Sequence, residues 1–170
     1  MALTTNTDQP GIGTVGEVRR ARWTVFVLCA AALLVIGQLY SVVPLLNVLA
    51  VRWSVTPSVA AWLVTVFGLA YAIGMLISGP LSDRFGRRRL ATIGVFATAA
   101  FTLTVAFSPN FPVALCLRIA QGLAAACFAP AVLAYIPERV TPSRRAFALS
   151  ALIGSFLAAA IVAPMVAGPR

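Results

Sequence analysis

Long uncharged, apolar stretches alternate with short segments that carry arginine along almost the whole chain. Uncharged runs of 29, 30 and 28 residues separate Arg22 from Arg52, Arg52 from Asp83, and Arg89 from Arg118. About 20 apolar residues in a helix, each rising about 1.5 Å, cross the hydrocarbon core of a bilayer. Each of these runs therefore predicts one membrane-spanning helix.

Two further apolar runs, residues 119–137 and 146–169, complete the pattern. The Ser-Pro-Asn-Phe-Pro segment at 108–112 separates the third run from the fourth, because proline lacks the amide donor that a helix needs. Only helices fit these runs, since an open sheet leaves backbone groups unsatisfied in lipid. The sequence therefore predicts an all-α membrane protein. Its five expected transmembrane helices are residues 23–47, 58–79, 89–107, 112–135 and 146–168.

Composition supports this interpretation. Of the 170 residues, 61% are hydrophobic and only 10% are charged, whereas soluble domains are about 25% charged. The polar residues 1–18 predict a disordered cytoplasmic tail, and residues 19–170 predict the transmembrane domain. The first span exceeds the apolar core of a signal peptide, which has about 7–15 residues. We expect this span to be retained, with cleavage near residues 48–50 as the alternative.

The net charge of +9 comes from 13 arginines and four acidic residues. Ten of the arginines fall in three clusters: before span 1, between spans 2 and 3, and between spans 4 and 5. Loops rich in arginine stay in the cytoplasm, so we expect a multi-pass protein of the cell (inner or plasma) membrane with a cytoplasmic N-terminus. Because the clusters explain the charge as a topology signal, we expect no nucleic-acid partner.

The sequence contains no recognisable catalytic motif. There is no histidine, no glycine-rich phosphate loop, and no serine or cysteine beside a recognisable base. These are the groups that acid–base, nucleophilic or phosphoryl-transfer chemistry requires. We therefore expect no enzyme activity, no metal site and no cofactor.

The segment between spans 2 and 3 reads Gly-Pro-Leu-Ser-Asp-Arg-Phe-Gly-Arg-Arg from position 79. It closely resembles the G-x-L-x-D-R-x-G-R-[RK] loop of the major facilitator superfamily of secondary transporters. The resemblance implies a cytoplasmic latch between the two halves of a transporter, and the alternative is a plain basic topology loop. The motif residues are Gly79, Leu81, Asp83, Arg84, Gly86, Arg87 and Arg88.

Physical reasons for this motif are clear at several positions. Gly79 is expected to let a helix end pack close to another backbone, and Gly86 to form a tight turn. Asp83 is expected to accept hydrogen bonds from helix N-terminal amides or to pair with Arg87 four residues later. The candidate partners of Arg87, at the cytoplasmic end of span 4, are Glu138 and Arg139.

Span 4 carries the sequence Arg-Ile-Ala-Gln-Gly from position 118. It resembles the R-x-x-Q-G element in the fourth helix of proton-coupled exporters of the same superfamily, which implies that Arg118, Gln121 and Gly122 act in proton coupling or substrate binding. Arg118 lies roughly 9 Å inside its span, where a charge is expensive, and snorkelling to the outer surface is the alternative. Further candidate groups for a cavity, or for plain interhelical hydrogen bonds, are Gln38, Tyr40, Asn47 and Tyr71.

Span 5 carries small residues at a spacing of four, followed by a Pro-x-x-x-Gly segment. Small residues so placed let a second helix approach closely. The segment from position 163 also resembles, in degenerate form, the G-P-x-x-G-G element of antiporters in the superfamily, and tight packing alone is the equal alternative. The stripe consists of Ala151, Ser155, Ala159, Ala163, Pro164, Ala167 and Gly168.

The resemblance implies an incomplete N-terminal six-helix half of a fold that has twelve spans in two halves, with the substrate bound between them. The expected function is secondary active transport, namely proton-driven efflux of small solutes or drugs. The expected partners are the lipid bilayer, a small-molecule substrate, and the C-terminal half or a partner membrane protein. Because alternating access needs two halves, we expect no transport by this chain alone. The alternative is a non-transporting membrane fragment or a helical subunit that packs on a partner.

Overall fold

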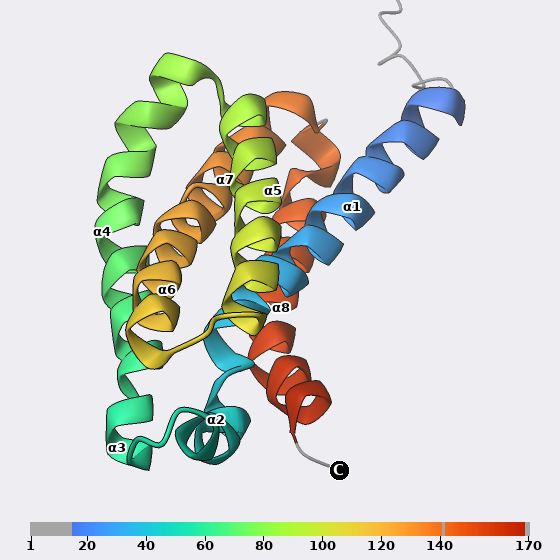
Figure 1. Ribbon diagram of the computed structural model, residues 1–170. Coiled ribbons are helices and arrows are strands. Elements are labelled where there is room, and N and C mark those ends of the chain that lie inside the picture. Colours follow the sequence, from blue (N-terminus) through green and yellow to red (C-terminus); the bar gives the residue numbers. More distant parts are fainter. Residues whose placement is uncertain (1–14, 141, 169–170) are drawn as a thin grey trace, which may run out of the picture.

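The computed structural model describes residues 15–140 and 142–168, and within these ranges it contains helices and no strand (Figure 1). Five stretches of the described chain are long and apolar enough to cross a membrane. The prediction of an all-α protein with five spans is therefore confirmed. The spans are Arg22–Arg52, Pro57–Phe85, Arg87–Ala106, Phe111–Glu138 and Pro142–Ala167.

The first span is an interrupted helix. Helix α1 covers Val15–Tyr40, and after a short turn the 3-10 helix η1 (Val43–Leu45) leads into α2 (Leu46–Arg52). Pro44 sits in the first turn of η1 and removes an amide donor, so the helix breaks there. Because α1 begins at Val15, residues 15–18 are helical and not part of a tail. The remainder of the predicted tail, residues 1–14, lies outside the described residues.

The second and third spans meet at a single glycine. Helix α3 (Pro57–Ala60) leads into α4 (Trp62–Phe85), and α5 covers Arg87–Ala106. The predicted loop from residue 79 onward is therefore wrong, because α4 continues through Pro80 to Phe85. Water beyond the bilayer surface solvates polar side chains on a continuing helix, so a helix need not end where its apolar stretch does. Only Gly86, with a φ of +88°, leaves the helical conformation at this junction.

The fourth span consists of α6 (Phe111–Ala126) and α7 (Phe128–Arg139), and the fifth is α8 (Pro142–Ala167). Cys127 interrupts the fourth span because Pro130 lacks the amide that would continue the hydrogen-bond ladder. The Cys127 amide instead donates to the Ala124 carbonyl three residues back, at 3.2 Å.

Helix α6 lies at the centre of the bundle, with α4 on one side and α5 on the other, while α8 packs along α1 (Figure 1). Half of the most apolar stretch of the fourth span is buried, against 28% or less in the other four. Glycines permit the close approach of α4 and α6. A Cβ atom at Gly122 would lie 2.5 Å from the Phe67 carbonyl oxygen, and one at Gly74 would lie 2.6 Å from the Ala126 Cβ.

The outer surface of the bundle is strongly apolar. Leu76, Phe107 and Met165 are 81%, 82% and 77% exposed, and such side chains in water would form an aggregation-prone patch. Lipid tails are as apolar as these side chains, so their exposure is stable in a bilayer.

The three arginine clusters gather at one end of the bundle. The start of α1, the junction of α4 and α5, and the junction of α7 and α8 all lie at the same end in Figure 1, at its top. Arg52, at the end of α2, lies at the opposite end, where it donates to the Ala106 and Ser108 carbonyls at 3.2 and 3.5 Å. This asymmetry is the one that the predicted orientation, with the arginine-rich end in the cytoplasm, requires.

We expect single cysteines at the two ends to report this orientation. In a variant whose three native cysteines are replaced, Ser58→Cys before α4 and Ser143→Cys at the start of α8 both occupy exposed positions. A membrane-impermeant maleimide added to intact cells should label position 58, and should label position 143 only after the cells are opened. The reverse pattern would contradict the orientation.

Candidate functional site

Arg118 occupies the interior of the most buried span. Asn110 begins α6 by accepting a hydrogen bond from the Val113 amide at 3.0 Å, and Pro112 sits in the first turn, where its missing amide is not needed. Arg118 follows about two turns later, about 10 Å along the helix. Its side chain is only 1% exposed and is the largest of the fully buried side chains.

Three helices supply acceptors to the Arg118 guanidinium. Nε donates to the Leu63 carbonyl on α4 at 3.2 Å, and Nη1 and Nη2 donate to the Gln38 carbonyl on α1 at 3.3 and 3.2 Å. Nη1 also donates to Oε1 of Gln121, one turn further along α6, at 2.8 Å. A buried cation is tolerated when its donors are satisfied in this way. The side chain therefore ties α1, α4 and α6 together.

An aromatic ring completes the surroundings of the Arg118 cation. The Arg118 guanidinium carbon lies 4.2 Å from the centroid of the Phe67 ring, a cation–π contact that contributes about 2 kcal/mol when desolvated. The side chain thus points into the protein. The alternative that Arg118 snorkels to the outer surface is wrong, because interior carbonyls and this ring solvate the charge.

Gln121 extends the Arg118 contacts into a buried polar cluster. The Gln121 side chain is 1% exposed. Its Nε2 donates to Thr102 Oγ1 on α5 at 2.8 Å and to Gln38 Oε1 at 3.4 Å, and Thr102 Oγ1 in turn donates to the Thr98 carbonyl at 2.7 Å. The structure thus brings together Arg118, Gln121 and Gln38, and links all three to α5.

Sequence reasoning missed Thr102. A signal existed, because Gly94, Thr98 and Thr102 follow one another at a spacing of four and so share one face of a helix. Gly94 and Thr98 are buried on that face, where a Cβ at Gly94 would lie 3.0 Å from the Ala124 carbonyl oxygen of α6. Small and polar residues on one face of a membrane helix indicate contact with protein and not with lipid.

The remaining cavity candidates lie at different depths. Tyr71 on α4 is partly buried and stacks on Phe67, with ring centroids 6.3 Å apart. Tyr40 ends α1 and is also partly buried. Asn47 lies on α2, exposed at the end of the bundle, and so is not part of the cluster around Arg118. The close approach of α4 explains why position 122 is a glycine.

Arg87 connects three helix ends at the arginine-rich end of the bundle. Its Nη1 donates to Glu138 Oε1 at 2.7 Å and to the Ala134 carbonyl on α7 at 3.0 Å, and Nη2 lies 3.6 Å from Asp83 Oδ1 at the end of α4. Both expected partnerships of Arg87, with Asp83 and with Glu138, are present in the structure. The two carboxylates are more than half exposed, so each pair contributes about 0–1 kcal/mol to stability.

The rest of the motif differs in part from expectation. A Cβ at Gly79 would meet nothing within 4 Å in the described part of the chain, so the close packing expected at this glycine involves none of the described helices. Leu81 is partly buried, and Arg84 and Arg88 are exposed. The side chain of Arg139 lies outside the described part of the chain.

The small-residue stripe of α8 faces α1. Ser155 and Ala159 are buried, and a Cβ at Gly37 of α1 would lie 3.3 Å from the Ala163 Cβ. The stripe thus acts as a packing surface. The members of the stripe that stay partly buried are Ala151, Ala163, Pro164, Ala167 and Gly168.

Metal chemistry has no support in the described residues, which contain no group of three or more side chains able to hold a metal ion. What the structure provides instead is a charged, hydrogen-bonded cluster inside a membrane-spanning bundle. Ionisable groups at that depth mark solute and ion pathways in membrane proteins.

Comparison with known proteins identifies the class. Residues 23–168 match the family model of the Major Facilitator Superfamily, and the chain belongs to this superfamily of membrane transporters. The chain is 32% identical to the uncharacterized MFS-type transporter YybF of Bacillus subtilis over 84% of its own length and 35% of that protein.

Two relatives carry more specific names. The chain is 31% identical to the probable multidrug resistance protein EmrY of Escherichia coli, over 63% of this chain and 21% of that protein. It is 30% identical to the niacin transporter NiaP of Acinetobacter baylyi, over 52% of this chain and 20% of that protein. The chain thus spans about a third or less of the length of these curated relatives.

We expect Thr102→Val to destabilise the bundle, because it removes the acceptor of a buried Gln121 amide. Leaving a buried donor unsatisfied costs about 1–3 kcal/mol. Thr104→Val is a matched control, since the exposed Thr104 hydroxyl donates only to carbonyls of its own helix. Thermal unfolding in detergent should show a clear drop for Thr102→Val and little change for Thr104→Val. Equal curves for the two variants would contradict the role of Thr102.

Proposed function

We propose that this chain is part of a proton-driven transporter that exports small solutes or drugs. The observation that carries the proposal is the buried Arg118, which donates to carbonyls of α1 and α4 and to Gln121 at depth in the membrane. A merely structural bundle gains little from such a charge, because desolvation makes it costly. A fixed cation near a transport pathway attracts anionic groups and repels protons, and both effects serve coupling.

Two properties of the Arg118 cluster support a role in coupling. Acceptors for the guanidinium come from α1, α4 and α6, and Gln121 adds α5, so a change of charge near this point acts on four helices at once. Most of these acceptors are backbone carbonyls or amide oxygens, which do not titrate. Arg118 therefore keeps its charge while a mobile proton or solute changes the field around it.

In this proposal the group that carries the proton is a carboxylate outside this chain. Of the four acidic residues in the sequence, Asp83 and Glu138 lie at the arginine-rich end of the bundle and contact Arg87, while Asp8 and Glu17 precede the first span. Proton transport through a membrane uses a carboxylate or comparable group within the hydrocarbon region. The curated relatives are about three times as long as the matched region or longer, so a complete transporter has room for that group.

The names of the relatives favour small organic molecules as cargo. One is named as a probable multidrug resistance protein and another as a niacin transporter. The likeness of Arg118, Gln121 and Gly122 to the element found in proton-coupled exporters supports export as the direction of transport.

The size of the native product separates this proposal from the alternative of a helical subunit or fragment. An N-terminal tag at the chromosomal locus, detected in membranes, should give a band well above the 17.8 kDa of this chain. A stable product of 17.8 kDa would favour the alternative, with a partner membrane protein on the exposed apolar faces.

We expect Arg118→Ala to lower proton-coupled efflux by the full-length gene product by about tenfold or more, since a buried charge and its hydrogen bonds contribute about 1.5–3 kcal/mol or above. Arg118→Lys should retain part of the activity, because it keeps the charge but loses the multiple donors of the guanidinium. Everted vesicles loaded with a pH-sensitive dye report efflux as substrate-induced release of protons. Arg89→Ala, at an exposed arginine outside the motif, is the control, and wild-type efflux in Arg118→Ala would rule out the role.

The second part of the proposal is that the cluster of Asp83, Arg87 and Glu138 acts as a cytoplasmic latch. Because the carboxylates are largely exposed, Asp83→Asn should leave insertion and unfolding temperature nearly unchanged. It should nevertheless reduce efflux several-fold, because a latch sets the balance between two conformations. Membrane fractions quantify insertion and the same vesicle assay measures efflux. Unchanged efflux in Asp83→Asn would argue for a plain basic segment.

A further inference from the structure

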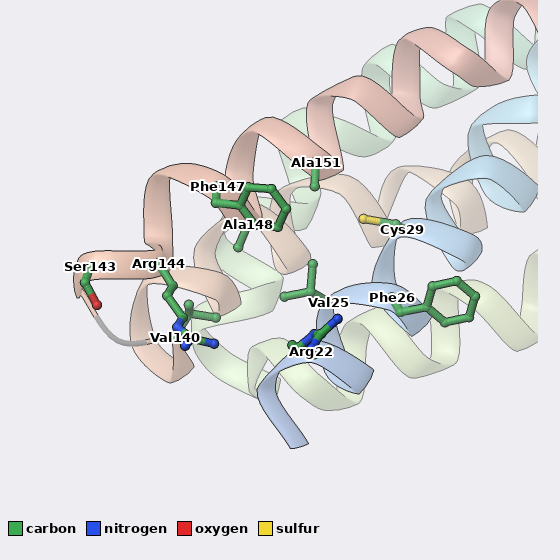
Figure 2. A pocket seen from close by; sticks show the side chains of 10 residues that line it. All are labelled: Arg22, Val25, Phe26, Cys29, Val140, Ser143, Arg144, Phe147, Ala148 and Ala151. Atoms are coloured by element: carbon green, nitrogen blue, oxygen red, sulfur yellow. The ribbon is translucent and has the colours of Figure 1, made fainter. Parts of the chain in front are cut away.

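A cavity of about 730 Å³ opens between α1 and α8 at the arginine-rich end of the bundle (Figure 2). Both helices begin at this end and run in the same direction (Figure 1). Each contributes an arginine near its start, Arg22 from α1 and Arg144 from α8. In Figure 2 these arginines lie at one end of the cavity, and Cys29 and Ala151 lie at the other.

Polarity changes with depth along both walls of this cavity. On α1, Arg22 is followed by Val25, Phe26 and Cys29, and on α8, Arg144 is followed by Phe147, Ala148 and Ala151. Seven residues of helix span about 10 Å. The cavity therefore has a cationic entrance at the membrane surface and about 10 Å of apolar wall below it.

The two arginines have no partner in the described part of the chain. Neither guanidinium makes a hydrogen bond or an ion pair there, whereas the guanidinium of the neighbouring Arg145 donates to the Val140 carbonyl at 3.0 Å. Among the side chains that the structure describes, no acidic one lines the cavity, and Asp83 and Glu138 at this end of the bundle contact Arg87. Arg144 also lies in the first turn of a 26-residue helix, whose N-terminal amides add positive potential.

We propose that this cavity binds an anionic phospholipid. The phosphate group lies between Arg22 and Arg144, and one acyl chain descends along Phe26, Phe147 and Ala151. Arginine suits this ligand because its planar donors match phosphate oxygens. The basic entrance favours an anionic lipid over a neutral one, since the attraction near the membrane surface is electrostatic. This site is separate from Arg118 and does not depend on the proposed transport.

The test compares two lipids on the purified protein. In neutral detergent, native mass spectrometry counts bound dioleoylphosphatidylglycerol and dioleoylphosphatidylcholine as each is titrated. We expect the first molecule of the anionic lipid to bind at least about tenfold more tightly than the neutral one, the order expected for two arginines near a phosphate. Equal affinities would overturn the proposal.

Matched variants locate the binding site. Arg22→Gln combined with Arg144→Gln should remove most of this preference for the anionic lipid. Arg84→Gln combined with Arg89→Gln removes the same charge at the same end but outside the cavity, and should change the affinity less than about twofold because rim charges act through a screened field. If both double variants lost the preference for the anionic lipid equally, general surface charge would explain the preference, and the proposed site would be wrong.

A third variant tests the apolar part of the site and guards against misfolding. Ala151→Leu narrows the lower cavity, leaves both arginines in place and keeps a strong helix former in α8. It should weaken binding of the anionic lipid by about threefold, since the acyl chain loses contact along the wall. Full affinity in Ala151→Leu would contradict insertion of an acyl chain. Helical content by circular dichroism should be the same in all variants.

Discussion

A guanidinium buried inside a lipid-embedded bundle needs hydrogen-bond acceptors around it, because an unsolvated charge at that depth is costly. Arg118 makes four hydrogen bonds, to carbonyls of α1 and α4 and to Gln121 on its own helix. To reach them, the helices must lie close to α6, and Gly122 permits this by leaving no Cβ against the Phe67 carbonyl. The small residue at position 122 therefore lets α4 approach α6 closely enough for the Leu63 carbonyl to accept from Arg118.

Charged side chains at the arginine-rich end of the bundle are more exposed than those in its interior. At the arginine-rich end, Arg87 contacts Asp83 and Glu138 in pairs that are largely exposed and hence weak individually. In the proposed latch, weak pairs between the ends of α4, α5 and α7 suit a contact that breaks and re-forms. Arg118 and Gln121 are buried, whereas the carboxylates that contact Arg87 are largely exposed to solvent.

The sequence predicted the five spans because lipid demands about 20 apolar residues per helix, and the arginine clusters limited each span. It did not predict that α4 continues through Pro80 to Phe85, since a proline removes one backbone hydrogen bond without necessarily ending the helix. Arg118, Gln121 and Gln38 were identified as polar groups in apolar spans. Thr102 was missed because a lone threonine is ordinary in a membrane helix, and only its register with Gly94 and Thr98 marks the face that meets α6.

The surroundings of the arginines differ, and orientation in the membrane does not account for all of them. Thirteen arginines give far more positive charge than orientation needs, and the structure divides them by surroundings. Arg118 binds interior carbonyls, Arg52 and Arg145 bind helix-end carbonyls, and Arg87 binds carboxylates. Arg22 and Arg144 have no such acceptor among the described residues and line one cavity from two helices. Phosphate is the abundant acceptor at the surface of a bilayer, and the lipid-binding proposal assigns it to these two arginines.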